Sequence, residues 1–307
     1  MQPTLAPAAA PTGTPSPFDL DNADGYARWR DARLAAAPTR LADLVVEVED
    51  PRQLTQAQFD AILDRCRRAN MAIYVGRTGE DPGKSIPVEL GARFGLHRLD
   101  HNPGADEDAV TSLKVQTDAR HRGYIPYTDR PIAWHTDGYY NTPERQIHGL
   151  LLHCVHPAAA GGANALLDHE IVYCLVRDRD PEFIRALMHP ECMTIPANEG
   201  EAPTGGTVTR AEQSGPVFSV RPDGRLHMRY TNRARNIRWR DDPLSAAAVD
   251  CLKTVLHTPG PWHLEGRLEP GWGLICNNVL HTRTGFADGP VPRLIYRARY
   301  YDRIAGT

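Results

Sequence analysis

The sequence predicts an α+β fold with a mainly β core, in the form of a jelly-roll barrel with flanking helices. Short strand candidates separated by turn residues dominate the chain from residue 113 onward. Helical patterns cluster at the start and in two inserts, at 168–188 and 243–257. The chain has no internal repeats and no Gly-rich phosphate loop. Short strands joined by turns are typical of double-sheet and closed β architectures, which the helices would cover.

The composition is that of an ordinary globular protein. Of 307 residues, 41% are hydrophobic and 24% are charged, which is enough apolar material for a sizeable core. We expect residues 18–307 to form a single domain. Residues 1–17 are rich in Pro, Ala and Thr and have neither a basic start nor an apolar run. They are expected to be a disordered leader and not a signal peptide.

Charge and cysteine usage argue against several kinds of partner. A net charge of −3 gives no electrostatic footprint for nucleic acid. No apolar run reaches the roughly 18 residues of a transmembrane helix, so no contact with a membrane is expected. The six cysteines are scattered without a Cys-x-x-Cys pair, which favours reduced thiols and a cytoplasmic location.

The first part of the chain alternates helices and strands. Thr55 and Gln58 have the spacing of a capping box, and apolar residues at helical spacing follow them. Pro38 stops the preceding helix. The elements expected in this part are helices at 21–37, from 55 onward and at 87–94, and strands at 44–48 and 72–75.

The second part supplies most of the strands. Asp168 and Asp180 are candidate caps of two short helices, and Pro243 opens an amphipathic helix to residue 257. The segment 190–215, rich in Gly, Thr and Glu, is expected to be a mobile loop and a candidate lid. The arginine-rich segment 229–240 favours a solvated surface over an anion site or a subunit contact. Strands are expected at 113–115, 148–155, 217–220, 226–230, 274–276 and 293–301.

One short motif stands out as a candidate metal site. His135 and Asp137 lie two residues apart in Trp134-His135-Thr136-Asp137-Gly138, so on an extended backbone they point to the same face. A third ligand is available at His281. Two histidines and one carboxylate leave open positions on Fe(II) for a co-substrate and dioxygen. The alternative is that these are ordinary surface or core residues, because the chain has 13 histidines.

A run of arginines follows the distal histidine. Arg293, Arg297 and Arg299 alternate with apolar residues and would share one face of a strand. Buried guanidinium groups are costly without anions, and their fork geometry suits a carboxylate. The alternative is a solvated strand face.

With these motifs in place, the sequence resembles the taurine dioxygenase-like (TauD/TfdA) family of Fe(II)/2-oxoglutarate-dependent oxygenases. The resemblance runs from about residue 44 to residue 303 and implies a double-stranded β-helix. It implies that His135, Asp137 and His281 bind Fe(II). It further implies that Arg293 holds the distal carboxylate of 2-oxoglutarate and that Arg297 binds an anionic group of the substrate.

Two of the departures from the family pattern bear on the ligands. The family's Gly-Gly-Asp-Thr turn reads Gly161-Gly162-Ala163-Asn164, so Asn164 stands where the family's Thr touches 2-oxoglutarate. An Asn amide can still donate a hydrogen bond there. Pro131 stands where the taurine-type enzymes carry a substrate-contacting Asn. A taurine substrate is therefore not expected.

The resemblance implies a dioxygenase that uses Fe(II), 2-oxoglutarate and O2 and releases succinate and CO2. Its reaction would be hydroxylation of an unactivated C–H bond in a small anionic or zwitterionic molecule. Tyr139, beside the metal motif, is a candidate substrate contact, although barrel packing is the simpler role. Two other classes stay open: a metal-dependent hydrolase on the same three residues, and a non-catalytic barrel that binds a small ligand. A homo-oligomer, as a dimer or tetramer, is also expected from the family.

Overall fold

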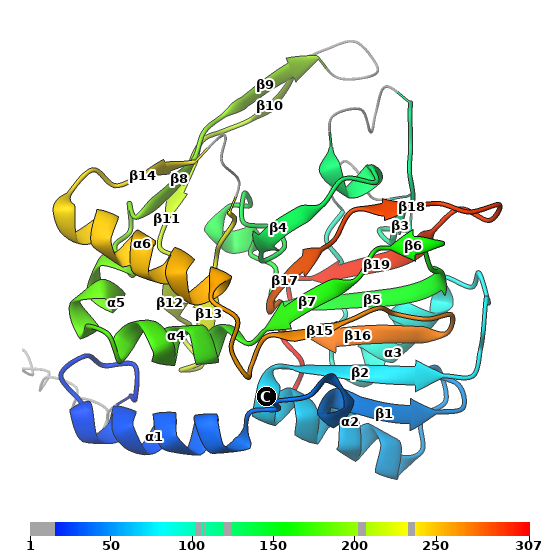
Figure 1. Cartoon of the computed structure of the whole chain (residues 1–307), viewed down its shortest axis with the longest axis horizontal. Helices are drawn as coiled ribbons and strands as arrows, with labels where there is room; N and C mark the ends of the chain where they lie inside the picture. The colour runs from blue at the N-terminus through cyan, green and yellow to red at the C-terminus, as the bar shows by residue number, and fades with distance from the viewer. Residues whose placement is uncertain (1–15, 102–105, 107, 119–123, 202–206, 233–236) are drawn as a thin grey trace, which may run out of the picture.

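The computed structural model describes residues 16–101, 106, 108–118, 124–201, 207–232 and 237–307 (Figure 1). Nearly all of the predicted leader, residues 1–15 of 1–17, therefore lies outside the described residues. The described elements fall into two groups, a β barrel and a group of helices and short strands beside it (Figure 1).

A six-stranded sheet forms one wall of the barrel. The first two strands in its order are parallel to each other, and the others pair antiparallel. These strands include all those expected near 44–48, 72–75, 113–115, 148–155, 274–276 and 293–301. In spatial order they are β1 (Val45–Val48), β2 (Met71–Gly76), β16 (Trp272–Cys276), β5 (Gly149–His156), β19 (Leu294–Tyr300) and β3 (Thr111–Leu113).

A four-stranded antiparallel sheet forms the opposite wall, and a short pair of strands extends it. Between the walls lies an aliphatic core that includes Leu152 and Leu274 from the large sheet and Leu166 and Leu264 from the small one. The architecture is the jelly roll that the sequence predicted. The strands of this wall are β15 (Leu264–Gly266), β7 (Asn164–Leu167), β17 (Leu280–Arg283) and β4 (Ile132–His135), and the short pair is β6 (Ala160–Gly161) with β18 (Phe286–Ala287).

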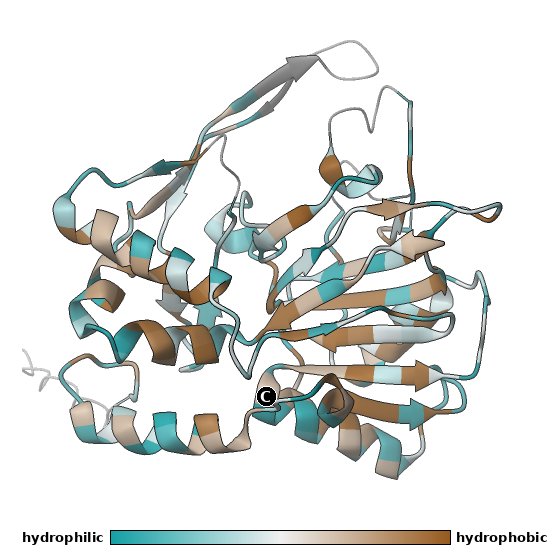
Figure 2. Ribbon diagram, in the orientation of Figure 1, coloured by the Kyte–Doolittle hydropathy of each residue, from teal (hydrophilic) through white to brown (hydrophobic). Residues whose placement is uncertain are grey.

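Two helices cover the outer face of the large sheet, α2 (Gln56–Ala69) and α3 (Ser85–Arg93). The predicted capping box opens α2: Thr55 Oγ1 accepts from Gln58 N at 3.3 Å, and Gln58 Oε1 accepts from Thr55 N at 3.0 Å. Ile62 and Cys66 then bury one face of α2 against the sheet. Apolar residues therefore cover both faces of most of the large sheet, whereas β19 carries Arg297 and Arg299 on its inner face; in Figure 2 the strands of this sheet are brown along much of their length.

The remaining helices pack together beside the barrel. Asp168, Asp180 and Asp242 each cap the helix that follows by accepting a backbone N–H. Among the described residues, no helix has both the length and the apolar character needed to cross a bilayer. The helices are α1 (Ala23–Ala36), α4 (His169–Arg177), α5 (Pro181–Leu187) and α6 (Pro243–His257), and the hairpin of β12 (Phe218–Val220) and β13 (Leu226–Met228) packs with them. Three 3-10 turns lie elsewhere in the chain, at Leu41–Leu44 before β1, at Ile125–Tyr127 before β4 and at Pro143–Arg145 between β4 and β5.

The expectation of a loop at 190–215 was wrong. Four strands lie there, and a fifth from beyond residue 236 completes one of their sheets. The backbone groups of these short, polar strands find partners in one another, which their Gly, Thr and Glu content did not signal. The strands are β8 (Met193–Ile195), β9 (Asn198–Glu201), β10 (Thr207–Arg210), β11 (Gln213–Gly215) and β14 (Arg238–Trp239), and the β9–β10 hairpin projects from the body in Figure 1.

Candidate metal centre and its surroundings

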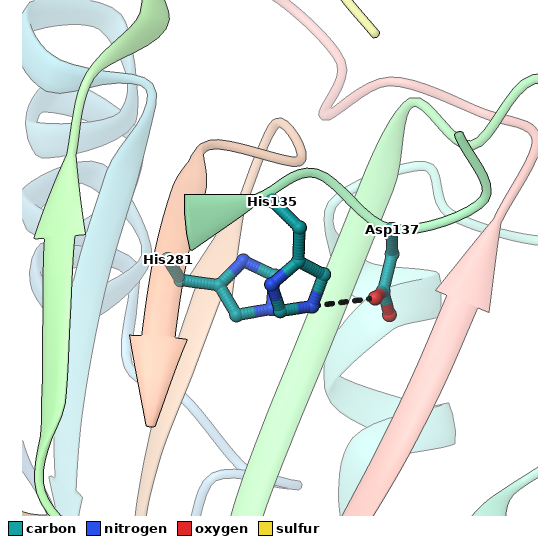
Figure 3. A group of neighbouring side chains, drawn as sticks. All are labelled: His135, Asp137 and His281. Carbon is teal, nitrogen blue, oxygen red and sulfur yellow. Dashed lines mark ion pairs between the residues drawn. The ribbon is translucent and has the colours of Figure 1, made fainter. Parts of the chain in front are cut away.

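Two histidines lie side by side on neighbouring strands of the small sheet. His135 is the last residue of β4, and His281 lies on β17, directly opposite it in the antiparallel register. Residues opposite each other in such a pair carry their side chains on the same face. The two rings therefore lie together, with centroids 4.2 Å apart (Figure 3).

Backbone carbonyls fix the tautomer of both imidazoles. Nδ1 of His135 lies 3.0 Å from the carbonyl oxygen of Ala133, and Nδ1 of His281 lies 3.0 Å from that of Val279. Because a carbonyl oxygen can only accept, each Nδ1 carries a hydrogen, and in the neutral ring the lone pair then lies on Nε2, where it can bind a metal. Burial, with His135 nearby, lowers the pKa of His281 to about 4. This ring is therefore neutral near pH 7, as a metal ligand must be.

Asp137 brings a carboxylate to the same point. It lies in the turn after β4, two residues beyond His135, and its Oδ1 lies 3.5 Å from His135 Nε2 (Figure 3). Its backbone is fixed from both sides by Asn278, whose Oδ1 accepts from Asp137 N at 2.8 Å and whose Nδ2 donates to Asp137 O at 2.9 Å. The same Nδ2 donates to Ile147 O at 2.7 Å. Asn278 thus ties the proximal ligand loop to the strand that carries the distal ligand.

The charge on Asp137 is stabilised by its neighbours. Burial acts to raise the pKa of this carboxyl group, but the positive charges of Arg297 and Arg299 and a hydrogen bond with His135 together outweigh burial and hold the pKa well below its usual value. Arg297 Nη1 lies 3.3 Å from Asp137 Oδ2. Among the described residues, Oδ2 has no hydrogen-bond partner although it is buried.

The donor set fits a divalent transition metal. One ligand atom from each of His135, Asp137 and His281 lies within 4.8 Å of the other two. Two imidazole nitrogens with free lone pairs and one ionised carboxylate are the set that non-haem Fe(II) takes in oxygenases. The sequence predicted these three residues, and the fold brings them together.

The arginines of β19 point into the barrel, as their alternation predicted. Tyr296 and Tyr300 on the alternate positions pack against the outer helices. Arg297 lies beside the metal ligand. Arg299, further along, is buried in an ion pair with Asp100 and donates to Tyr140 OH at 2.9 Å. The charge of Arg299 is therefore already balanced within the protein, whereas the counter-ion of Arg297 among the described residues is the metal ligand Asp137.

Arg293 lies in a second cationic site, away from the ligands. Its guanidinium is buried 5.1 Å from the centre of the Phe286 ring, and Arg283 lies 4.9 Å from the same ring. A Cβ on Gly162 would lie 3.7 Å from Arg293 Nε, so the turn leaves room for this side chain. Burial lowers the pKa of each arginine to about 10. In the described part of the chain, neither forms an ion pair, and Arg293 Nη1 is buried without a partner.

Sequence reasoning missed the role of Arg283. Its Nη2 donates to the carbonyl oxygens of Thr128 and Arg130 at 2.6 Å, and its Nη1 to that of Pro126 at 3.3 Å. It thereby fixes the segment that leads into β4. The only available signal was its place two residues after His281, because its partners are backbone atoms that no sequence motif marks.

The other two predicted site residues, Asn164 and Tyr139, make hydrogen bonds or ring contacts within the protein. Asn164 Nδ2 donates to Thr282 O at 2.7 Å. The Tyr139 ring lies edge-on to Tyr140 at 5.2 Å, and its carbonyl accepts from Arg229 Nε at 2.7 Å.

The expectation that Arg229 is solvated was wrong. This guanidinium is buried and donates to four backbone carbonyls, those of Tyr139, Met193, Gln213 and Gly215, which replace water for it. Arg238 and Arg240 of the same segment are exposed in ion pairs, as expected for a solvated surface. Arg233 and Arg235 lie outside the described residues.

Comparison with known protein families identifies the family and the enzyme class of the chain. Residues 42–299 match the family described as Taurine catabolism dioxygenase TauD, TfdA family. The chain belongs to this family. It is an Fe(II)- and 2-oxoglutarate-dependent dioxygenase that acts on a small molecule, as its sequence predicted. This class displaces the hydrolase and the non-catalytic barrel as readings of the three residues.

Individual relatives agree with that class. A uridine-5'-phosphate dioxygenase from Amycolatopsis sp is 29% identical over 200 residues, covering 62% of this chain and 67% of the relative. One from Streptomyces sp is 31% identical over 206 residues, covering 63% and 69%. In fold, the chain is similar to the non-heme iron oxygenase OrfP in complex with Fe, succinate and (3S)-hydroxy-L-Arg. The TM-score is 0.60 at 16% identity, with 81% of this chain and 82% of that chain covered.

Proposed function

We propose that His135, Asp137 and His281 hold the Fe(II) of this dioxygenase. The observation that carries the proposal is the convergence of their ligand atoms within 4.8 Å in a buried place. The two Nε2 lone pairs and the carboxylate are ready to bind without prior loss of a proton from His281, whose pKa is about 4. Bound there, Fe(II) would supply the activation of dioxygen that is coupled to decarboxylation of 2-oxoglutarate.

We further propose that Arg293 binds the distal carboxylate of 2-oxoglutarate. A buried guanidinium without an acidic partner calls for an anion, and a planar fork suits a carboxylate. Phe286 and Gly162 exclude water from one side of this group and strengthen its attraction. Asn164 keeps a second amide hydrogen beyond the one it donates to Thr282, and we assign that hydrogen to the co-substrate.

For the substrate, we propose a small molecule with an anionic group near the reacting carbon, and a nucleoside 5'-phosphate as the first candidate. Arg297 supports the anionic group: it points into the barrel beside Asp137, and its buried Nε has no hydrogen-bond partner in the part of the chain that the structure describes. A bound metal ion would take over the charge of Asp137 and leave the charge of Arg297 for the substrate. The names of the two relatives support the nucleotide. Tyr139, on the same loop as Asp137, is the proposed aromatic contact.

A paired comparison of substrates tests this assignment. Succinate release by the Fe(II)-loaded protein would be measured with uridine-5'-phosphate and with uridine. We expect the phosphate to stimulate turnover and the nucleoside to fail, and we expect Arg297→Gln to reduce the difference between them. The matched control is Arg238→Gln, an exposed arginine of β14. Stimulation by both compounds alike would contradict the role of the anionic group, and stimulation by neither would contradict the nucleotide.

We also propose that residues 18–307 form one catalytic domain, that the chain forms a homo-oligomer and that it works in the cytoplasm. A single apolar cluster that joins Phe18 of the start to Leu280 of the barrel supports the domain. The six free cysteines, five of them buried, support a reducing compartment. Light scattering on the protein as it elutes from a size-exclusion column would give the oligomeric state.

A further inference from the structure

A small cavity lies inside the barrel, between the two sheets. Its volume is about 20 Å³. Aliphatic side chains from three parts of the fold form its walls: Ile73, Leu152 and Leu274 from the large sheet, Leu166 from the small sheet, and Leu41 and Leu268 from the segments at its outer end.

The walls offer almost nothing to a water molecule. Three side chains with polar atoms line the cavity, Asn164, Arg267 and Trp272; the first two already have partners, and the second amide hydrogen of Asn164 is the one assigned above to the co-substrate. Asn164 Nδ2 donates to Thr282 O at 2.7 Å, and Arg267 pairs with Glu269 at 2.9 Å. A buried water needs two to four polar partners, and a cavity without them stays dry and accepts apolar guests. The cavity therefore suits a small apolar molecule.

The cavity is next to the candidate metal centre. Leu166 is the antiparallel register partner of His281, and Leu152 is that of Arg297. Residues opposite each other in a register share one face, with Cβ atoms about 4.5–5.5 Å apart. Two walls of the cavity are thus the immediate neighbours of a metal ligand and of the arginine beside the other ligand.

The outer end of the cavity is close to solvent. Leu41, Leu268 and Trp272 at this end are half-buried, whereas Ile73 and Leu274 at the inner end are buried. A Cβ on Gly266 would lie 2.2 Å from Leu41 Cδ2, so only glycine lets Leu41 lie against this edge. Neither Arg293 nor Arg297 lines the cavity, so a guest that entered here would lie among aliphatic side chains.

We propose that this cavity is the entry and holding site for dioxygen on its way to the metal. The inference rests on the proposed function, because it needs oxygen to be consumed at His135, Asp137 and His281. Of the molecules that the reaction uses, dioxygen alone is small and apolar. 2-Oxoglutarate and an anionic substrate carry charges whose transfer into an aliphatic cavity would be costly.

Dioxygen itself is the first probe. In the metal-free protein with labelled methyl groups, dissolved O2 broadens the resonances of methyls that it approaches. Ile73 lines the cavity, and Ile275 on the adjacent strand is equally buried but faces the outer helices, so it is the matched control. We expect clearly stronger broadening at Ile73 than at Ile275. Equal broadening at both positions would overturn the proposal.

A cavity-filling variant tests the path in turnover. Leu268→Phe should raise the KM for O2 several-fold and leave the KM for 2-oxoglutarate unchanged, with the broadening at Ile73 lost. Leu34→Phe, at a half-buried position of α1, is the matched control and should change neither. A filled cavity with an unchanged KM for O2 would overturn the proposal. So would a rise in the KM for 2-oxoglutarate, which would make the cavity part of the co-substrate pocket. If the protein bound no iron, the proposed function would fail, while the methyl experiment would still decide whether O2 enters the cavity.

Discussion

His135 and His281 stand directly opposite each other in the antiparallel pair of β4 and β17, and this register creates the metal centre. A shift by one residue would turn one imidazole out of the barrel, because side chains alternate along a strand. The pair is followed by an irregularity between His281 and Arg283. That irregularity lets Arg283 reach the carbonyl groups before β4, so one short strand provides both a ligand and a brace.

Removal of either imidazole should abolish iron binding at this centre. For His281→Ala we expect a loss of Fe(II) affinity beyond the roughly 10–100-fold that outer-shell changes cause, because a ligand itself is removed. Competition with a chelator measures the Fe(II) affinity of each variant. The control is His156→Ala, a half-buried histidine at the end of β5. Iron binding that survives in His281→Ala but not in His156→Ala would refute the centre.

Asn278 should matter for the metal more than for the fold. Asn278 has a left-handed backbone, with φ 52°, so Asn278→Gly removes the amide without backbone strain. We expect about 10- to 100-fold weaker Fe(II) binding, because the Asp137 loop loses its hydrogen bonds. Its neighbour Asn277 also makes three buried hydrogen bonds, but to the chain end and to Asn70.

Asn277→Ala is therefore the matched control for Asn278→Gly. It should lower the free energy of unfolding by about 1–3 kcal/mol and leave the iron affinity of the folded protein unchanged. Equal losses of iron affinity in both variants would show that Asn278 acts through general stability alone.

Arg293 should determine the affinity for 2-oxoglutarate. Truncation of one partner of a buried charge pair costs about 2–5 kcal/mol, so Arg293→Met should weaken co-substrate binding by roughly 30-fold or more. Anaerobic calorimetry of the iron-loaded variant gives the dissociation constant. Arg267→Met, a half-exposed arginine paired with Glu269, serves as the control. An unchanged dissociation constant in Arg293→Met would show that Arg293 does not bind the distal carboxylate of the co-substrate.

A buried and a half-buried histidine away from the metal should make the fold sensitive to acid. His148 and His227 lie with ring centroids 4.7 Å apart. Burial, with Arg221 and Arg303 nearby, lowers the pKa of His148 to about 3, and burial, with His148 nearby, lowers that of His227 well below its usual value. The unfolded chain takes up protons below about pH 6.5, whereas the folded chain does not. Stability is thus fully present above that pH and is lost as the pH falls toward the folded values.

The size of this loss is roughly 1.4 kcal/mol for each unit by which a pKa is lowered. Urea unfolding of the metal-free protein at several pH values would measure it. His148→Leu should make the free energy of unfolding less dependent on pH. His97→Leu, at an exposed position, should leave that pH dependence unchanged. A dependence equally steep in His148→Leu would contradict this origin.

The sequence predicted the residues that meet across strands but not those that brace them. His135 and Asp137 could be identified because a spacing of two on an extended chain needs no knowledge of the fold, and the Arg297 face followed from the same rule. The bracing by Arg229 and Arg283 could not be predicted, because their partners are backbone carbonyls on remote segments. The strands within 190–215 were missed for a related reason: each is only three or four residues long, and their backbone partners are decided by tertiary pairing.

Anaerobic titration of the Fe(II)-loaded protein with 2-oxoglutarate tests the central claim most directly. Chelation of the metal by the keto acid gives a weak visible charge-transfer band, which needs a metal with two adjacent open positions. We predict that the band appears and saturates in the natural chain and is absent in Asp137→Ala. Iron demonstrably bound by His135, Asp137 and His281, with no band at any 2-oxoglutarate concentration, would contradict the account.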